Sequence, residues 1–332
     1  MRKLLVFCAL LFVAPVFAQD IHWSQYNDNP VFQNPGNSGR FQGDYRLHAN
    51  YRDQWRSVTV PFRTLSFSGD MKFRERPEIG LGALFFSDVA GDGKFRTVEL
   101  QIAPSYQFKL TPDSTHTLRF GIQAGLNHRQ VNFAGFSFDA QFNGTYYDPS
   151  LGTNELYQQA KNTNISVGTG AVYEYYVHPR EKISGGIAFF NLNRPNQGFY
   201  GDKIQRDIRM NVFAKAQYKL NYDWDILPSL MVQLQGKYKE IIFGSTARYI
   251  LLDRLGEYRA VYFGAFFRNR DAGYVSAGLD YQNWYAGVSY DLNFSKLVPA
   301  SNARGGLEVS LRYILTSFKP KKVIHRVCPD YI

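Results

Sequence analysis

Cysteine is nearly absent from this sequence of 332 residues, which contains only Cys8 and Cys328. Cys8 lies in an apolar N-terminal run that we interpret as a removable leader. The mature chain then keeps Cys328 alone, which excludes an intramolecular disulfide. Methionine is also scarce, with four residues. A large exported chain without disulfides needs a fold that is otherwise well closed.

The usual motifs of catalysis and cofactor binding are missing as well. No histidine stands at metal-ligand spacing with another His, a Cys or an acid, and there is no G-x-S-x-G elbow, phosphate loop or dinucleotide fingerprint. The stretch "SDVAGDG", Ser87 to Gly93, fits a hairpin turn better than a calcium loop. We therefore expect no metal, no cofactor and no enzymatic activity. The alternative left open is a Ser, His and acid set that converges only in three dimensions.

Long apolar runs are lacking except at the N-terminus. Arg2 and Lys3 precede the run Leu4–Val16, which ends at the small residue Ala18. This pattern predicts a secretory signal peptide over residues 1–18, because the run is shorter than the roughly 20 residues of a spanning helix. Removing the two basic residues lowers the net charge from +10 to +8. Export, and the lack of a basic run interleaved with aromatics, argue against nucleic acid as a partner.

Aromatic residues are abundant, with 23 Tyr and 27 Phe, and the chain has 28 Gly, which favours an all-β protein rich in turns. In "FQGDYRLHANYR", Phe41 to Arg52, apolar or small residues alternate with polar ones, as in a strand with one polar face. The stretch is about twice the usual length of a soluble strand. The same alternation recurs in "RTLSFSGDMKF", "TVELQIAPSYQFKL", "LRFGIQAGLNHR", "IRMNVFAKAQYKL" and "LEVSLRYIL".

Together with weaker segments, such as "IGLGALFF", the pattern predicts about fourteen strands, an even number as in outer-membrane barrels. Short turns such as "RERP" and "TPDST" alternate with longer connections such as Asp53–Phe62, Gln130–Asn164 and Asn191–Gln205, although those near "GKYKE" and "NRDAG" are short. The long loops of such barrels face outward, which puts both termini in the periplasm. A soluble β-sandwich is the alternative, but its strands are usually shorter.

We therefore predict a transmembrane antiparallel β-barrel over residues 41–316. A periplasmic N-terminal segment would precede it over 19–40, and a periplasmic tail would follow over 317–332, carrying Cys328 and Pro329. The surroundings would be outer-membrane lipid and lipopolysaccharide. Charged residues at mid-strand would face the lumen and form a paired network, in which Asp44 or Asp70 is the partner expected for Arg46 and Arg52. The expected members are Asp44, Arg46, Arg52, Asp70, Arg209, Glu308 and Arg312.

Several stretches together resemble one known family. They are, in order, "HWSQYNDNPVFQNPGNSG", "GDYRLHANYRDQW", "VPFRTLSFSGD", "NLNRPN", "FRNRDAG", "SYDLNFSKL", "GGLEVSLRY" and the terminal "VCPDYI". Their order and spacing are similar to those of the PorP/SprF family of outer-membrane proteins of the type IX secretion system, over essentially the whole mature chain. The chain departs from the family at "GNSG", at "GGLEVSL" and at Asp330.

The resemblance implies a non-enzymatic barrel that supports export and surface retention of a cognate secreted protein, such as a gliding adhesin, by binding its C-terminal sorting domain. It also implies an OmpA-like peptidoglycan-binding protein as a periplasmic partner. A general porin or solute channel is the alternative. We expect the partner to be bound at the outer rim, where seven residues are candidates: Gln54, Trp55, Phe62, Asn193, Pro195, Arg268 and Asp271.

Overall fold

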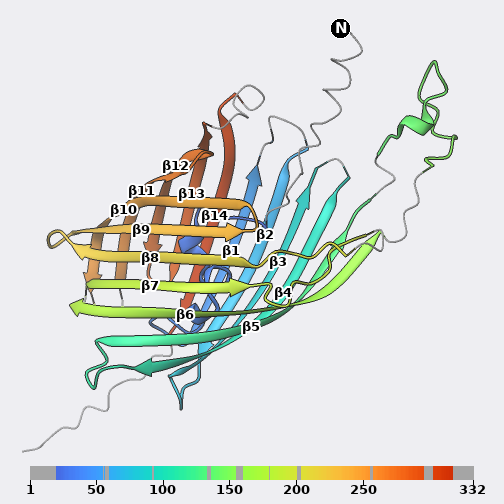
Figure 1. The fold of residues 1–332 in the computed structure, drawn as a ribbon. Coiled ribbons are helices and arrows are strands. Elements are labelled where there is room, and N and C mark those ends of the chain that lie inside the picture. Colours follow the sequence, from blue (N-terminus) through green and yellow to red (C-terminus); the bar gives the residue numbers. More distant parts are fainter. Residues whose placement is uncertain are drawn as a thin grey trace, which may run out of the picture.

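A computed structural model describes residues 20–54, 56, 60–91, 93–132, 136–154, 160–178, 180–199, 203–254, 257–294 and 302–316. Its main feature is a closed barrel in which every strand is antiparallel to its neighbours and β1 pairs with β14 (Figure 1). The strands are β1 (Tyr45–Gln54), β2 (Phe62–Lys72), β3 (Ile79–Ala90), β4 (Phe95–Lys109), β5 (His116–Gln130), β6 (Lys161–His178), β7 (Glu181–Phe190), β8 (Arg209–Lys219), β9 (Trp224–Gln235), β10 (Tyr238–Arg254), β11 (Glu257–Arg268), β12 (Ala272–Tyr281), β13 (Trp284–Asn293) and β14 (Arg304–Leu315).

The prediction of an antiparallel barrel with about fourteen strands is confirmed, and the alternation explains the wall. In β1, Leu47 is 55% exposed on the outside, whereas Arg52 is 1% exposed on the inside. Closure satisfies the backbone of every strand, so the apolar side chains can face lipid. Within the described part of the chain, no helix is long and apolar enough to cross a membrane.

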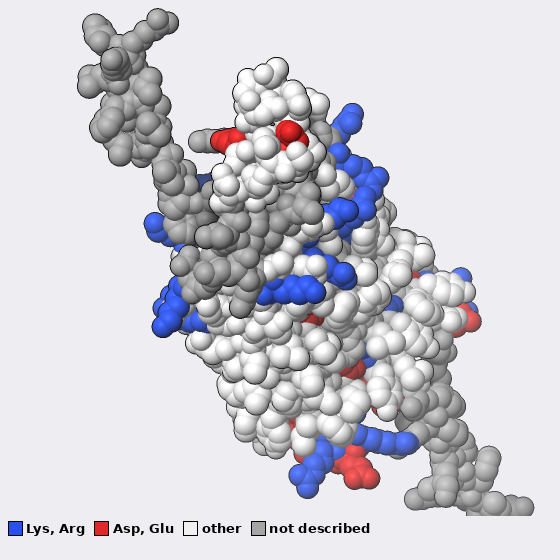
Figure 2. Space-filling view, turned by 90° about the vertical axis from the view of Figure 1, so that its right-hand side faces the viewer, with Lys and Arg blue, Asp and Glu red and all other residues white. Residues whose placement is uncertain are grey.

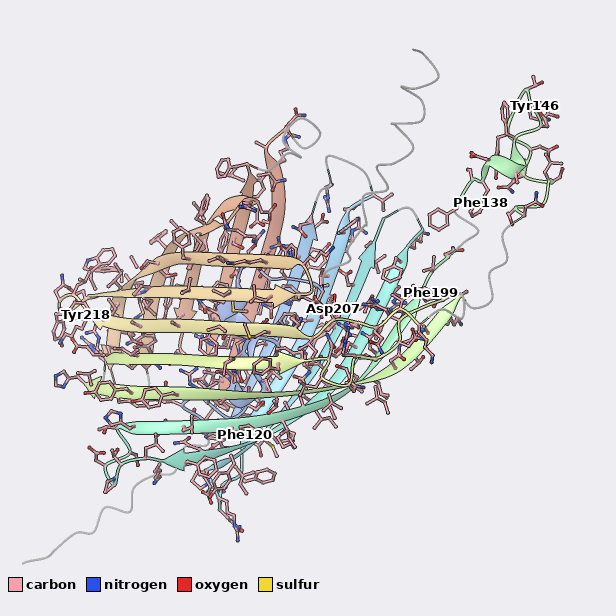
Figure 3. The ribbon with its side chains drawn as sticks, viewed as in Figure 1. Phe120, Phe138, Tyr146, Phe199, Asp207 and Tyr218 are labelled. Carbon is pink, nitrogen blue, oxygen red and sulfur yellow. The ribbon has the colours of Figure 1, made fainter. Side chains whose placement is uncertain are left out.

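The two ends of the barrel differ in their connections. One end, here called the loop end, carries the connections after the odd-numbered strands, including the long segments 131–160 and 191–208. The other, here called the turn end, carries the connections after the even-numbered strands and the end of β14 at Leu315. The loop between β5 and β6 projects well beyond the strands and carries Phe138 and Tyr146, whereas Tyr218 lies at the turn end (Figure 3).

Residues 20–44, here called the plug segment, lie inside the barrel (Figure 1). The segment contains η1 (Tyr26–Asp28), α2 (Pro30–Gln33) and η2 (Pro35–Asn37). The prediction of a periplasmic segment over 19–40 is therefore wrong for its described part, which fills the lumen. The residues of the segment itself do not indicate this position, because the segment lacks a hydrophobic period and its short helices contact strands that are distant in the sequence.

The plug segment also runs from one mouth of the barrel to the other. The Asp20 N–H donates to Gln235 Oε1 at 2.9 Å, at the loop-end terminus of β9. The Asp44 N–H donates to the Leu315 carbonyl at 2.9 Å, at the turn end. The first described residue and the end of β14 thus lie at opposite mouths, whereas the sequence led us to expect both termini on one side.

The outer surface carries charge mainly toward its two ends. In Figure 2, basic side chains gather in the upper half of the molecule and mixed charges at its lower edge, with a broad uncharged area between them. Large apolar side chains that point outward from the strands, such as Leu100, Ile122, Ile183 and Val275, are exposed around the barrel. An uncharged band between two charged ends is the surface that a bilayer requires.

Candidate functional site

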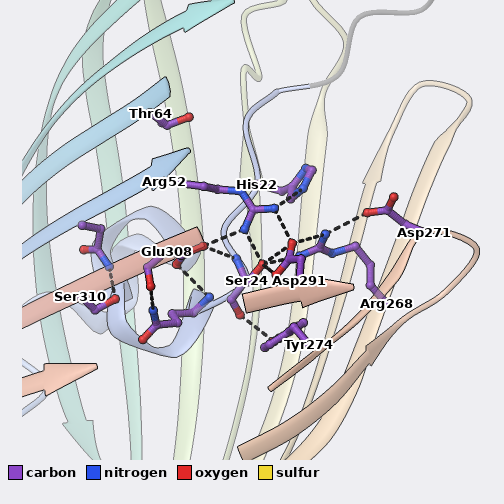
Figure 4. Close-up of polar contacts among 12 residues, drawn as sticks. His22, Ser24, Arg52, Thr64, Arg268, Asp271, Tyr274, Asp291, Glu308 and Ser310 are labelled. Carbon is purple, nitrogen blue, oxygen red and sulfur yellow. Dashed lines mark hydrogen bonds and ion pairs between the residues drawn. The ribbon is translucent and has the colours of Figure 1, made fainter. Parts of the chain in front are cut away.

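Ser24 of the plug segment lies at the centre of a buried polar network near the loop end (Figure 4). Its hydroxyl donates to Asp291 Oδ1 at 2.8 Å, and its N–H donates to Glu308 Oε2 at 2.8 Å. The neighbouring Gln25 N–H donates to Glu308 Oε1 at 2.9 Å. Tyr274 donates its hydroxyl hydrogen to the Ser24 carbonyl at 2.6 Å. These bonds fix Ser24 and Gln25 to the wall.

Arg52 of β1 joins this network through both ends of its guanidinium. It contacts Glu308 Oε2 on β14 at 2.8 Å and Asp291 Oδ2 on β13 at 2.8 Å, and it also bonds to the Ser24 hydroxyl. The side chains of all three charged residues are 1% exposed or less. Its partners are therefore neither Asp44 nor Asp70, the two carboxylates expected from the sequence. Those candidates were drawn from residues nearby in the sequence, whereas barrel closure places β14 next to β1, with β13 as the following strand.

Arg268, which the sequence assigned to the outer rim, is a further member of this network and is 1% exposed. It bonds to Asp271 Oδ2 at 2.8 Å, to Asp291 Oδ2 at 3.2 Å and to the Ser24 hydroxyl at 2.6 Å. The rim assignment is therefore wrong for Arg268. Although Arg268 is the last residue of β11, its side chain turns into the lumen, while its partner Asp271 is half-buried in the adjoining turn.

His22 lies on the same segment and contacts Arg52 Nη2 at 3.3 Å. Burial, with Arg268 and Arg52 nearby, lowers the pKa of His22 well below its usual value, so the ring is neutral at pH 7. At the start of the segment, Asp20 is paired with Arg206 at 2.8 Å. Burial disfavours the ionised carboxyl, but Arg206 and other arginines outweigh it and hold the pKa of Asp20 below its usual range.

Aromatic residues anchor the plug segment to two parts of the wall. Tyr26 packs edge-on against Phe266 and donates its hydroxyl hydrogen to Ser229 Oγ at 2.8 Å. On the other side, Phe32 packs against Phe86. Arg209, expected in the lumen network, lies between the Phe32 and Phe190 rings, 4.4 and 4.2 Å from their centroids. These contacts bury apolar surface as a globular core does.

Close backbone packing holds the middle of the plug segment. The Asn34 amide donates to the Ala171 and Ile187 carbonyls at 3.1 and 3.0 Å, across neighbouring strands. A Cβ on Gly121 of β5 would lie 2.5 Å from the Gly36 nitrogen. Real Cβ atoms do not approach backbone so closely, so glycine at position 121 makes room for the plug segment.

The remaining predicted lumen residues lie nearer the turn end. Arg46 pairs with Asp70 at 2.8 Å, one of the two partners expected for it, and the Gly39 N–H donates to Asp70 Oδ2 at 2.7 Å. Arg312 pairs instead with Asp280 at 2.7 Å. Asp44 is half-buried just before β1 and outside the Arg52 network.

The other predicted rim residues are placed in different ways. Gln54 ends β1 and Phe62 begins β2, and both are half-buried at the loop end, while Trp55 lies outside the described residues. Asn193 is exposed, and its amide bonds to the Val167 N–H at 3.2 Å and the Ile165 carbonyl at 2.7 Å. Asn193 thus extends the edge of β6 beyond its pairing with β7.

Pro195 follows in the same loop and is half-buried, and its carbonyl accepts from the Arg206 N–H at 2.9 Å. The tail, with Cys328 and Pro329, lies outside the described residues, as does the predicted leader. Among the residues that are described, no group of three His, Cys, Asp or Glu side chains could hold a metal ion.

The tip of the β5–β6 loop lies within the long connection Gln130–Asn164 expected from the sequence, but its residues were not among the seven rim candidates. Phe142 and Tyr147 form an isolated antiparallel bridge, and the Asn143 side chain accepts from the Thr145 and Tyr146 N–H groups at 3.0 Å each. The tip is therefore a small ordered hairpin. Phe142, Tyr146 and Tyr147 are all exposed on it, Tyr146 at 61%. The stretch "NGTYYD" contains the signal for this turn, because Asn-Gly favours hairpins.

Residues 16–313 match the sequence model of a family described as type IX secretion system membrane protein PorP/SprF. The chain belongs to this family. As a PorP/SprF protein with a closed barrel, it is an integral protein of the outer membrane. No functionally curated protein matches its sequence.

Solved structures similar to this PorP/SprF protein are other outer-membrane barrels. The toluene transporter TbuX of Ralstonia pickettii is 9% identical, with a TM-score of 0.52 over 87% of this chain and 94% of its own. The toluene transporter TodX of Pseudomonas putida is 9% identical, with a TM-score of 0.53 over 86% and 93%. A FadL homologue of Pseudomonas aeruginosa is 11% identical, with a TM-score of 0.51 over 86% and 94%. At this identity the likeness concerns the fold alone.

Proposed function

We propose that this PorP/SprF protein is a non-enzymatic barrel that retains a cognate secreted surface protein by binding its C-terminal sorting domain at the loop end. The observation that carries the proposal is the ordered aromatic hairpin at the tip of the β5–β6 loop. Exposed Tyr and Phe side chains on a rigid turn are typical anchors of protein–protein contacts, because they bury large areas at little cost in conformational entropy.

The position of the hairpin supports recognition of a large partner. The loop projects beyond all the strand ends, so its aromatic side chains can be covered by a folded domain without entering the lumen (Figure 3). Family membership supports the same class of partner, since the family belongs to a protein secretion system. On the turn side we propose an OmpA-like peptidoglycan-binding protein as the partner that links the barrel to the cell wall and to the gliding machinery.

A solute channel is the second candidate, because the similar solved structures include transporters. Such a channel needs a continuous path through the lumen. The plug segment instead crosses the lumen and is fixed to the wall by Ser24, Tyr26 and Asn34. This arrangement favours a scaffold whose lumen is filled over one that conducts solutes.

The test is capture of a purified sorting domain by the purified barrel in detergent. We expect the barrel to bind the sorting domain of its cognate secreted protein, and to lose this binding when Phe142, Tyr146 and Tyr147 are all changed to serine. Tyr218→Ser and Tyr222→Ser, which alter exposed tyrosines at the turn end, serve as matched controls. Equal binding by the triple variant and the controls would contradict the proposed site.

A further inference from the structure

A large cavity lies inside the lumen alongside the plug segment and extends from the Ser24 network to the turn end. Its volume is about 1120 Å³, and it is lined by strand residues, by plug residues (Ser24, Gln25, Asn27, Asp28 and 39–43), and by the turn residues Ser114, Arg180 and Gln282. Because residues of three separate turns line it, the cavity is open at the turn end. The aromatic hairpin lies at the opposite mouth, so this site is separate from the proposed binding site of the sorting domain.

The walls of the cavity carry a surplus of positive charge. The lining contains eight basic residues, namely Arg40, Arg46, Lys72, Arg180, Lys182, Lys215, Arg248 and Arg312. It contains four acidic ones, namely Asp28, Glu174, Asp253 and Asp280. A concave, low-dielectric site lined mainly by one sign of charge concentrates ions of the opposite sign.

Asp70 and Asp225, which are not among the lining residues, pair with lining arginines and reduce this surplus. They do not remove it, because two carboxylates are each shared between two cations. Glu174 pairs with both Arg40, at 3.0 Å, and Lys182, at 3.7 Å. Asp225 likewise pairs with both Arg180, at 2.6 Å, and Arg248. Each trio of side chains therefore keeps one uncompensated positive charge.

Lys215 of β8 is the lining residue best placed to bind an anionic group in the cavity. Within the described residues it forms no ion pair, and its ammonium lies 5.1 Å from the Phe213 ring centroid. Ser184 of β7 and Ser229 of β9 lie directly opposite Lys215 on its two sides, and both also line the cavity. Both serines are less than 9% exposed.

The hydrogen bonds of Ser229 leave its own proton for a ligand. Its Oγ accepts from the Tyr26 hydroxyl at 2.8 Å and from Asn27 Nδ2 at 3.2 Å. A hydroxyl has two acceptor lone pairs and one donor, so Ser229 can still donate one hydrogen bond. An ammonium flanked by hydroxyl donors is a suitable cradle for a carboxylate.

We propose that this cavity binds an acidic peptide segment of a partner protein, with one carboxylate held by Lys215, Ser184 and Ser229. Lys72 on β2 and Lys215 on β8 stand on nearly opposite walls of the barrel, so one small anion cannot reach both. Several carboxylates along an extended chain can do so. The spread of the charges therefore favours a peptide over inorganic phosphate.

The experiment measures binding of hexaglutamate to the purified barrel in detergent by calorimetry, with hexaglutamine and inorganic phosphate as comparison probes. We expect hexaglutamate to bind one to one, to weaken as salt is added, and to bind at least about tenfold more weakly to Lys215→Gln. The control Lys161→Gln removes an exposed lysine at the loop end and should bind hexaglutamate as the native protein does.

Three results would overturn the proposal. They are absence of hexaglutamate binding, equal affinity of native and Lys215→Gln proteins, and phosphate or hexaglutamine binding as tight as that of hexaglutamate. Folding of each variant is verified by its heat-dependent migration in detergent gels. If Lys215→Gln does not fold, Lys182→Gln on the neighbouring strand takes its place, with the same expected loss and the same contradiction if affinity is unchanged.

Discussion

At the scale of single residues, Glu308 is a buried carboxylate whose stability depends on several partners at once. Its carboxylate accepts the N–H groups of two successive plug residues and pairs with a buried arginine, while its own side chain is fully buried. A carboxylate in such a position is expensive to desolvate and is stable only while all its partners are in place. The residue therefore couples the position of the plug segment to the integrity of the wall.

We expect Glu308→Ala to lower the free energy of unfolding by about 3–5 kcal/mol, because it leaves Arg52 short of one buried partner and two backbone N–H groups unsatisfied. The measurement is the midpoint of heat-induced unfolding in detergent gels. Glu257→Ala, which changes an exposed glutamate at the start of β11, is the control and should leave the midpoint nearly unchanged. A Glu308→Ala protein as stable as this control would contradict the assigned role.

The burial of Asp28 in the plug segment predicts that the stability of the barrel depends on pH. Burial raises the pKa of Asp28 to about 6, although Arg312 and Lys215 act against this shift, so its contribution to stability is present below pH 4 and is lost as pH rises through about 6. We therefore expect Asp28→Asn to stabilise the barrel above pH 6, by on the order of 2 kcal/mol, with no difference at pH 4.

The same unfolding assay at a series of pH values checks this prediction for Asp28. The control is Asp113→Asn in the exposed turn after β4, where hydrogen bonds from Thr111 and Thr115 lower the pKa of the carboxyl. Because the native state favours the ionised form of Asp113, Asp113→Asn should remove a stabilising contribution as pH rises, which is the reverse of the effect expected for Asp28→Asn. An Asp28→Asn effect that does not grow between pH 4 and pH 7 would count against the burial argument.

At the scale of structural elements, the wall and the plug segment differ in how far the sequence reveals them. The strands were predictable because one-sided burial forces a period of two, as Tyr45 to Arg52 illustrate. The plug segment was not, since its contacts depend on residues more than 200 positions away, such as Asp291 and Glu308. One usable signal was present, namely glycine at inward positions such as Gly121, where a polar side chain would otherwise stand.

We expect Gly121→Leu to displace the plug segment, because even its Cβ would lie 2.5 Å from the Gly36 nitrogen. Displacement should open a path through the barrel, so the conductance of single molecules in a planar bilayer should rise severalfold. Gly185→Ala, on the outward side of β7, is the control, since the nearest heavy atom to its Cβ is 3.3 Å away. Unchanged conductance in a folded Gly121→Leu protein would show that the plug segment is not held there.

At the scale of the whole molecule, the plug segment changes the expected position of the N-terminus. Both termini were expected on one side, as in barrels whose first strand starts directly after a periplasmic segment. Here Asp20 lies beside Gln235 at the loop end, and the chain then crosses the lumen to begin β1 at the turn end. The even number of strands remains correct, but the additional crossing moves the start of the described chain to the other mouth.

This arrangement predicts which segments share a side of the membrane. An epitope placed ahead of Asp20 should be as accessible to antibody on intact cells as one inserted at Gly144 in the β5–β6 loop. An epitope within the turn 111–115 should become accessible only after the outer membrane is permeabilised. If the epitope ahead of Asp20 instead behaves like the one in the turn, the lumen crossing is contradicted.

The positions of the residues that bind Ser24 suggest an order in which the parts of the barrel fold. Arg52, Asp291 and Glu308 stand on β1, β13 and β14, the strands that meet where the first and last parts of the chain join. The plug segment carries the large side chains Trp23, Tyr26 and Phe32, which are packed among residues of the wall. We therefore expect the plug segment to lie in place before β14 pairs with β1, so that the last strands of the barrel close around the first part of the chain.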